Sequence, residues 1–342
     1  MSNRITEKYF THTGFSDAAK TLKEIVAATG FRPGQEIFRG QIYDKNKVGS
    51  LIYRGQWRNK PAVLKIQGLC PEIDEIDIIK RFNRQNKSTK VRLPRLYGGK
   101  KWNKINGYGY LLLEYIDAPK IYRPPFADTR QMRDFRALYQ EYKSRCLNTP
   151  LFAQEPDERQ SLRFVMKRLK HWLAVAQSKG RVNKTTKAMV RKFQALARRH
   201  LPGVRMKFMH GHFTYDDIYK LSANEYVLMS NLFWSYRPEY YDAAFHLWAG
   251  IKSIRKQHIT VNYVISYLEK WIAEYKKLPI VRKDAGFERK FYLMMAERCV
   301  AALLVDLRNQ YYASNRQKHI THLVKLFSGI FDYCGEQLNK NK

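Results

Sequence analysis

Met206-Lys-Phe-Met-His-Gly-His-Phe-Thr-Tyr-Asp-Asp-Ile-Tyr219 is the stretch on which the prediction of the fold depends. Both of its ends are apolar, and His210-Gly211 forms a tight turn between them. Three ionisable side chains, His212, Asp216 and Asp217, follow the turn closely. The stretch is either an ordinary acidic surface loop or a loop that faces a phosphate-bearing ligand. The sequence around it has to decide between these two interpretations.

The composition indicates a globular protein. The chain has 342 residues, of which 44% are hydrophobic and 14% aromatic, enough to bury a substantial core. No uninterrupted apolar run approaches the roughly 18 residues of a membrane-spanning helix, and the first residues lack an apolar segment of signal-peptide length. The four cysteines lie far apart without zinc-ligand spacing, which predicts buried thiols and a reducing, cytoplasmic location.

The net charge of +33 is the most unusual property of the composition. Such an excess of lysine and arginine is typical of proteins that bind nucleic acid or another anionic surface. The excess is spread over the whole chain, however, and the sequence contains no basic tail. A basic nucleic-acid-binding protein therefore stays open as an alternative, beside a general bias of the proteome towards basic residues.

The first region of the chain predicts an antiparallel sheet. A short helix is expected over residues 16–29, with Ser16 as its N-cap. Short polar connections join the next runs and favour an antiparallel meander, with Asn106-Gly107 as its last hairpin turn. The expected strands cover residues 36–43, 50–55, 61–67, 95–102 and 108–115.

Lys65 lies inside the third of these apolar runs. Lysine is rarely buried without a partner, so its side chain either points to solvent or meets a carboxylate. A helix is expected over residues 71–85, with Pro71 in its first turn. Glu75 of this helix, and less well Glu72, could meet Lys65.

From Pro119 onward the pattern is mainly helical. Residues 1–117 are expected to form one region with its leading helix, and residues 118–342 a helical region, giving an α+β protein. One strand is expected over residues 225–232. The expected helices cover residues 130–142, 158–177, 185–200, 240–254, 261–275, 287–307 and 318–334.

This order of elements resembles the two-lobed, protein-kinase-like fold of the aminoglycoside phosphotransferase and choline kinase family, over roughly residues 35–335. The resemblance implies a five-stranded antiparallel N-terminal lobe that binds ATP, and a mainly helical C-terminal lobe. It implies that Lys65 neutralises nucleotide phosphates and is held by Glu75. It also implies that backbone groups of Glu114 and Ile116 contact adenine.

The turn at residues 44–49 corresponds to the phosphate-covering turn of that fold. It has one glycine where the fold often has a glycine-rich cradle. Lys45 and Lys47 are expected to contact the phosphates there through their side chains.

The loop quoted first departs from the family's catalytic pattern of His-Gly-Asp, four residues, then Asn. His210 and Gly211 match, but His212 stands where the catalytic aspartate belongs, and Asp217 where the metal-binding asparagine belongs. Ser230 replaces the aspartate that holds magnesium in the family. Asp242 matches the structural aspartate that braces the catalytic loop.

These departures favour a catalytically impaired pseudokinase that retains nucleotide or polyanion binding, or binds a protein partner. Serine is a poorer Mg²⁺ ligand than a carboxylate, so magnesium binding is expected to be weak, with Asp217 as the remaining charged ligand. The alternative is an active phosphotransferase that moves the γ-phosphate of ATP to a hydroxyl of a small molecule. In that case His212 would accept the proton, with Asp216 and Asp217 beside it.

Overall fold

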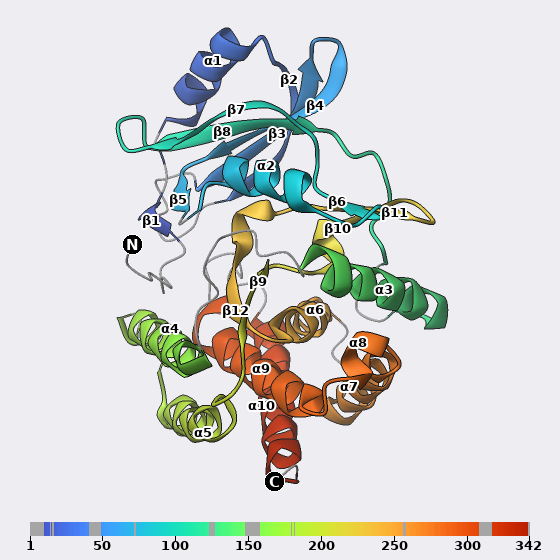
Figure 1. Cartoon of the computed structure of the whole chain (residues 1–342). Coiled ribbons are helices and arrows are strands. Elements are labelled where there is room, and N and C mark those ends of the chain that lie inside the picture. Colours follow the sequence, from blue (N-terminus) through green and yellow to red (C-terminus); the bar gives the residue numbers. More distant parts are fainter. Residues whose placement is uncertain are drawn as a thin grey trace. The chain divides into compact units, whose positions relative to one another are not determined.

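The computed structural model describes residues 10–13, 15, 17–40, 49–71, 73–122, 127–147, 158–178, 180, 182–255, 258–307 and 317–340 (Figure 1). They form two compact units. Unit 1 contains the described residues of Lys120–Ile218 and Trp234–Lys342, and unit 2 contains those of Lys8–Pro119 and Tyr219–Phe233. The division differs from the expected regions 1–117 and 118–342, because Tyr219–Phe233 groups with the first part of the chain. The proposed roles of the two regions stay predictions.

The predicted five-stranded antiparallel sheet of unit 2 is confirmed. Its strands follow the order β2-β3-β4-β8-β7, and all neighbours are antiparallel. Arg58 and Asn59 connect β3 to β4 with positive φ angles of 49° and 61°, as a two-residue hairpin turn requires. The strand bounds are β2 (Arg32–Gly40), β3 (Ser50–Trp57), β4 (Lys60–Gln67), β7 (Leu96–Asn103) and β8 (Tyr108–Glu114).

Two helices of unit 2 begin later than expected. Helix α1 (Ala18–Thr29) is capped by Asp17, whose side chain accepts a hydrogen bond from Lys20 N, whereas Ser16 lies outside the described residues. Helix α2 (Glu75–Gln85) begins after its N-cap Asp74. Pro71 is not in its first turn, because it belongs to β5 (Leu69–Pro71), which pairs with β1 (Phe10–Thr13). The pairing of β1 with β5 is a long-range contact that local patterns do not reveal.

The two faces of strand β4 meet different helices. Ala62, Leu64 and Ile66 are fully buried in an apolar cluster that includes residues of α1. Because side chains alternate along a strand, Val63 and Lys65 point to the opposite face, on the side of α2. Figure 1 shows α1 and α2 on opposite faces of the sheet. Burial of each large aliphatic side chain stabilises the fold by about 1.5–3 kcal/mol, which holds this face of β4 in the core. Because side chains alternate, Lys65 then lies on the opposite face.

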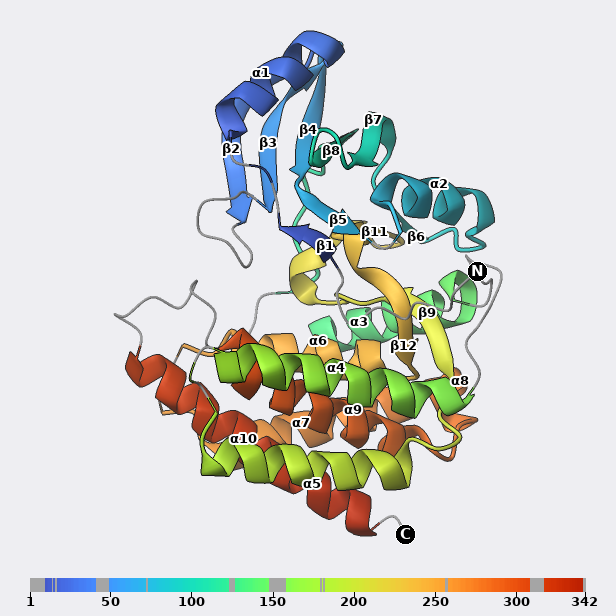
Figure 2. The ribbon, with the colours of Figure 1, turned by 90° about the vertical axis from the view of Figure 1, so that its left-hand side faces the viewer.

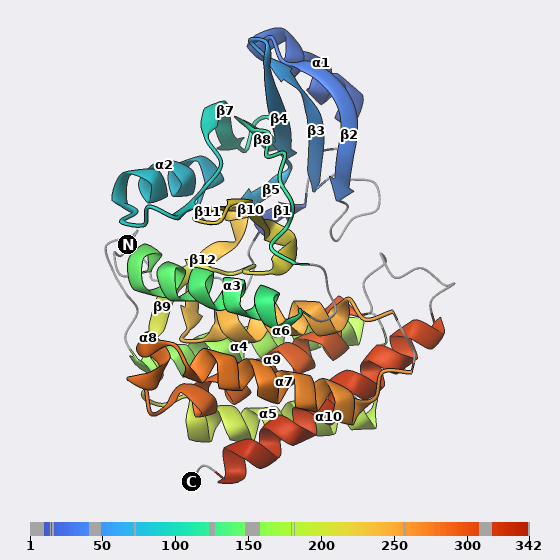
Figure 3. The ribbon, with the colours of Figure 1, turned by 90° about the vertical axis from the view of Figure 1, so that its right-hand side faces the viewer.

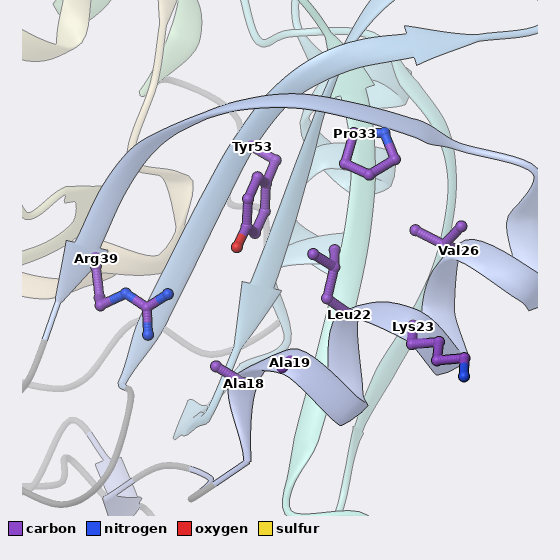
Figure 4. Close-up of a pocket in the computed structure, with 8 residues that line it drawn as sticks. All are labelled: Ala18, Ala19, Leu22, Lys23, Val26, Pro33, Arg39 and Tyr53. Carbon is purple, nitrogen blue, oxygen red and sulfur yellow. The ribbon is translucent and has the colours of Figure 1, made fainter.

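A shallow groove of about 420 Å³ separates α1 from the outer strands β2 and β3 (Figure 4). None of the described residues that line it is a predicted site residue. The groove is lined by Ala18, Ala19, Leu22, Lys23, Val26, Pro33, Arg39 and Tyr53.

The hairpin that follows the quoted loop extends unit 2. Strands β10 (Ile218–Ser222), β11 (Glu225–Leu228) and β6 (Val91–Arg92) form a second sheet in the order β10-β11-β6. β11 is parallel to β6, and the guanidinium of Arg92 bonds Glu225 at 2.8 Å. Strand β6 has two residues and pairs with a segment more than 130 residues away in the sequence. This pairing explains why the expected regions 1–117 and 118–342 differ from units 2 and 1.

Unit 1 is mainly helical, with one antiparallel pair of strands, β9 (Met206–His210) and β12 (Trp234–Pro238). Helix α9 is buried on nearly all sides and contacts α5, α6 and α10 (Figures 1 and 3). None of the helices in the described residues is long and apolar enough to cross a membrane. The helices are α3 (Thr129–Glu141), α4 (Glu158–Ser178), α5 (Lys184–His200), α6 (Tyr241–Lys252), α7 (Val261–Lys276), α8 (Pro279–Arg282), α9 (Phe287–Ala301) and α10 (Gln317–Lys340).

Two of these helices continue into π-helical turns. The turn Tyr142–Cys146 follows α3, and Ala302–Asp306 follows α9. Such turns are frequent at functional sites.

Candidate functional site

Lys65 and Glu75 form a buried ion pair in unit 2. Lys65 Nζ lies 2.5 Å from Glu75 Oε2, and the two residues are 9% and 2% exposed. Asp74 positions Glu75 at the first turn of α2, because its Oδ1 accepts the N–H of Ile76 at 2.9 Å. The lysine therefore does not point freely to solvent. Its role towards a nucleotide stays a prediction, and Glu72 lies outside the described residues.

The end of strand β8 is held by a second ionic contact in unit 2. The carboxylate of Glu114 accepts two bonds from Arg92, at 2.6 and 3.0 Å, and a third from Arg95 N at 3.1 Å. Burial raises the pKa of Glu114, but the hydrogen bonds and positive charges of Arg92 and Arg95 together outweigh this effect and lower the pKa. These bonds occupy the side chain of Glu114. Contacts of its backbone and that of Ile116 with adenine stay predictions, and Lys45 and Lys47 lie outside the described residues.

The quoted loop lies in unit 1 and is anchored by aromatic side chains. Phe213 is fully buried and stacks on Tyr142, with ring centroids 4.4 Å apart. The hydroxyl of Tyr142 accepts the backbone N–H of His210 at 2.8 Å. Tyr142 begins the π-helical turn after α3. In the sequence it stands only as the last residue of the helix expected over residues 130–142, and nothing there pointed to this bond.

His212 and Asp217 face each other across the loop. A hydrogen bond joins His212 Nδ1 and Asp217 Oδ2. The side chain of His212 is 38% exposed and that of Asp217 13% exposed. Asp216 points elsewhere, because its Oδ1 accepts a bond from Lys120 Nζ at 2.8 Å. The structure thus brings His212 and Asp217 together and pairs Asp216 with a lysine.

Asp242 is fully buried at the start of α6. Its Oδ1 accepts bonds from the hydroxyl of Tyr139 at 3.0 Å and from the N–H of Ala243 at 2.9 Å. Burial, and then the charge of Asp242, raise the pKa of Tyr139 well above its ordinary value. The side chain that accepts the N–H of the loop backbone is that of Tyr142. Any bracing of the loop by Asp242 therefore acts through the aromatic cluster that contains Tyr139 and Tyr142. The bracing role stays a prediction.

Ser230 lies in unit 2, two residues after the end of β11 at Leu228. Its φ is 55°, in the left-handed region, where a residue other than glycine costs on the order of 1–3 kcal/mol. The next residue, Asn231, is buried, and its Nδ2 donates to Leu228 O at 3.0 Å. The structure therefore offers neutral oxygen atoms at the position where the resemblance implies a magnesium carboxylate.

The donor groups do not fit the metal site of an active kinase. The described residues include no cluster of three or more His, Cys, Asp or Glu side chains that could hold a metal ion. The two carboxylates of the loop already bond a lysine and an imidazole, as described above. Mg²⁺ prefers several hard, anionic oxygen ligands. Ser230 and the engaged carboxylate of Asp217 supply such ligands poorly.

The sequence matches no protein-family model, and a search of curated proteins finds no match. Solved structures match over nearly the whole chain. Aminoglycoside phosphotransferase APH(4)-Ia aligns with a TM-score of 0.56 at 10% identity, covering 94% of this chain and 99% of that chain. A thermostable mutant of it, solved with ADP and hygromycin B, gives 0.56 at 10% identity, covering 92% and 97%. Amicoumacin kinase hAmiN, solved with AMP-PNP, Ca²⁺ and Ami, gives 0.56 at 14% identity, covering 93% and 94%.

The chain therefore has the protein-kinase-like fold of the aminoglycoside phosphotransferases. At this level of identity the likeness establishes the fold, as the resemblance predicted. The activity has to be argued from the residues themselves.

Proposed function

We propose that this chain is a kinase-like protein that binds a nucleotide and is impaired in phosphoryl transfer. The observation that carries the proposal is the bond between His212 and Asp217. By the resemblance, the imidazole of His212 stands at the position of the catalytic carboxylate. The bond engages the carboxylate of Asp217, which would otherwise be available to a metal ion.

The chemistry of phosphoryl transfer gives this observation its weight. The reaction needs a positioned hydroxyl and charges that neutralise the transferred phosphoryl group, and little covalent help. A catalytic metal ion contributes several kcal/mol of that charge stabilisation. A histidine in place of the aspartate, together with Ser230 in place of the second carboxylate, removes negative ligands for the metal.

The buried pair of Lys65 and Glu75 supports retained nucleotide binding. Glu75 fixes the ammonium group at 2.5 Å, so the charge is positioned before a ligand arrives. Similar folds solved with ADP and AMP-PNP add support. Lys45 and Lys47 are proposed to contribute further positive charge to the same phosphates.

The first prediction concerns nucleotide binding and its dependence on magnesium. ATP should raise the melting temperature of the wild-type protein by nearly the same amount with Mg²⁺ as with a chelator. The shift should disappear in a Lys65→Met, Glu75→Gln double variant, which keeps the buried site neutral and so avoids an unpaired charge. Lys60→Ala, an exposed lysine on the same strand, is the matched control and should retain the shift.

Two results would contradict this proposal. Stabilisation by ATP that appears only with Mg²⁺ would refute the impaired metal site. The absence of any shift in the wild type, measured up to millimolar ATP, would refute nucleotide binding.

The same bond also favours a second candidate, an active small-molecule phosphotransferase. A carboxylate that bonds one ring nitrogen of a histidine is the arrangement that orients a general base. Because Nδ1 bonds Asp217, a hydroxyl proton would be accepted at Nε2. ATP turnover that is lost in His212→Ala, while the ATP-induced thermal shift persists, would favour this candidate over the pseudokinase.

A further inference from the structure

The exposed side of helix α5 carries a line of cations. The helix has no acidic residue, and Lys184, Lys187, Arg191 and Arg198 are all exposed. At 3.6 residues per turn, these four side chains fall within roughly 60° of one another over about 21 Å of the helix axis. We call these four residues the α5 stripe.

The cations of the α5 stripe are not neutralised. Some exposed lysines in the described structure have carboxylate partners, such as Lys101 with Asp77 at 2.7 Å. On α5 itself, Lys192 bonds Asp332 at 2.8 Å. Within the described part of the chain, by contrast, no carboxylate pairs with any member of the stripe. Like charges at this spacing repel each other, which destabilises the helix by a few tenths of a kcal/mol for each pair.

The positions between the cations suit an extended partner. Ala188 and Ala195 are exposed and lie on the same side of the helix as the stripe. Their short side chains leave the line of cations accessible to a broad, rigid ligand. Neither offers a hydrogen-bonding group that could read the edge of a base, so recognition here would depend on charge and shape.

Helix α4 extends the charged surface. It packs beside α5, and Figure 2 shows the two helices next to each other along one side of unit 1. Arg163, Lys167 and Lys170 of α4 are exposed and, at their spacing, share one face of that helix. Exposed cations are therefore present on two neighbouring helices.

We propose that the α5 stripe, extended by α4, binds the backbone phosphates of a double-stranded nucleic acid without reading its sequence. Such a duplex presents regularly spaced phosphates along a rigid rod, which matches a straight line of cations. Binding releases the condensed counterions of the phosphates and relieves the repulsion within the stripe. The proposal concerns unit 1 and does not depend on the proposed nucleotide binding by Lys65.

An anionic membrane is the other polyanion that this charge could meet. Stable binding to a lipid surface normally adds apolar side chains that enter the bilayer. Among the described residues, the large apolar side chains that are exposed are Ile37, Phe38, Ile105, Leu221 and Tyr263. None of them lies on α4 or α5, so the surface favours the nucleic acid.

The test measures binding of the full chain to a labelled 24-base-pair RNA duplex by fluorescence anisotropy at several salt concentrations. We expect micromolar affinity for the wild type near physiological salt. The variant K184Q/K187Q/R191Q/R198Q should bind at least tenfold more weakly, with a salt slope (log affinity against log salt) smaller by about 3–4. Glutamine has a high helix propensity, so α5 should persist, which circular dichroism checks.

Matched variants make the outcome decisive. K20Q/K23Q/K100Q/K104Q removes the same charge from exposed lysines of unit 2 and should bind as the wild type does. R191K/R198K keeps the charge and should also retain binding. The α5 variant should still show the ATP-induced thermal shift, so failure here is distinguishable from failure of the proposed function.

Three results would overturn the proposal. The first is an equal loss in the α5 variant and the unit 2 variant, which would mean that the overall charge decides. The second is no measurable binding of the duplex by the wild type. The third is binding to phosphatidylserine vesicles that is lost in the α5 variant, without binding to the duplex.

Discussion

At the residue scale, unit 2 contains the pair of Lys65 and Glu75 and unit 1 contains the pair of His212 and Asp217, and the two pairs differ in their exposure to solvent. The pair of Lys65 and Glu75 is almost fully buried, so solvent and salt screen it weakly. In the pair of His212 and Asp217, the side chain of His212 is 38% exposed and that of Asp217 is 13% exposed, so water reaches mainly the imidazole. Loss of one partner therefore has different consequences. In the first pair it leaves an uncompensated buried charge, whichever partner is lost. In the second pair, loss of Asp217 leaves the partly exposed His212, whereas loss of His212 leaves the buried carboxylate of Asp217 without this bond.

His246 provides a pH-dependent prediction at the same scale. It is fully buried, its ring stacks on Phe135, and it bonds the hydroxyls of Tyr122 and Tyr275. Burial lowers the pKa of His246 well below its ordinary value of 6.5. Below that value the unfolded chain gains a proton that the folded protein does not, so stability falls as the pH falls.

The expected contribution of His246 is a loss of about 1.4 kcal/mol in the free energy of unfolding between pH 7.5 and 5.5. Urea unfolding of the wild type and of His246→Gln at both pH values isolates this contribution. The variant should show a correspondingly smaller pH dependence. His258→Gln, an exposed histidine, serves as the control. Equal pH dependence in the wild type and His246→Gln would contradict the prediction.

At the element scale, the π-helical turn Tyr142–Cys146 connects α3 to the loop. Its first residue is fully buried and accepts the backbone N–H of His210, while its ring stacks on Phe213. The turn thus fixes the loop by one hydrogen bond and one aromatic contact. The sequence predicted a regular helix over residues 130–142 and no helical turn beyond it, so the π-helical continuation to Cys146 is seen only in the structure.

Tyr142→Phe should retain the aromatic contact and lose the hydrogen bond. A buried N–H without its acceptor costs about 1–3 kcal/mol, so the melting temperature should fall. The backbone amide of His210 should also exchange its hydrogen with solvent faster. A global loss of stability would speed exchange at many amides and would not single out His210. Tyr263→Phe, at an exposed position, should change neither measurement. Unchanged exchange at His210 in Tyr142→Phe would show that the bond does not hold the loop.

At the scale of the whole molecule, the net charge of +33 opposes folding through repulsion. Some of this charge is neutralised locally, as in the contacts of Arg92 with Glu114 and Glu225. The fold gathers other cations, most clearly on α5, where they have no acidic neighbours in the helix. Chain-wide repulsion and the basic surface on α4 and α5 are separate consequences of the same composition.

Added salt should therefore stabilise the protein. Screening weakens repulsion between exposed charges more than it weakens the buried pairs. Raising NaCl from about 0.02 to 0.3 M, where the Debye length becomes shorter than most separations between exposed charges, should raise the melting temperature by roughly 2–4 °C. An equal osmolality of sucrose controls for effects unrelated to charge. A melting temperature that falls with NaCl would indicate that surface ion pairs outweigh the repulsion.

The sequence by itself determined the five-stranded sheet and the longer helices, and it left Lys65 either to solvent or to a carboxylate of the helix expected over residues 71–85. These follow from local periodicity and turn residues, which act over a few positions. It also located the loop of His212 and Asp217. The sequence prediction missed the short strands β1, β5, β6 and β12. It also misplaced element boundaries, such as the start of α2 after Asp74 and the end of the strand expected over residues 225–232, which stops at Leu228.

Only the tertiary structure decided the features that depend on distant contacts. It placed Tyr219–Phe233 in unit 2 through the pairing of β11 with β6, joined Tyr142 to His210, and bonded His212 to Asp217. It also showed that four of the basic residues, which are spread evenly along the sequence, form a line on one side of α5. The physical reason is common to all of these features. Side chains far apart in sequence, or on one face of a helix, acquire neighbours only when packing fixes the backbone in space.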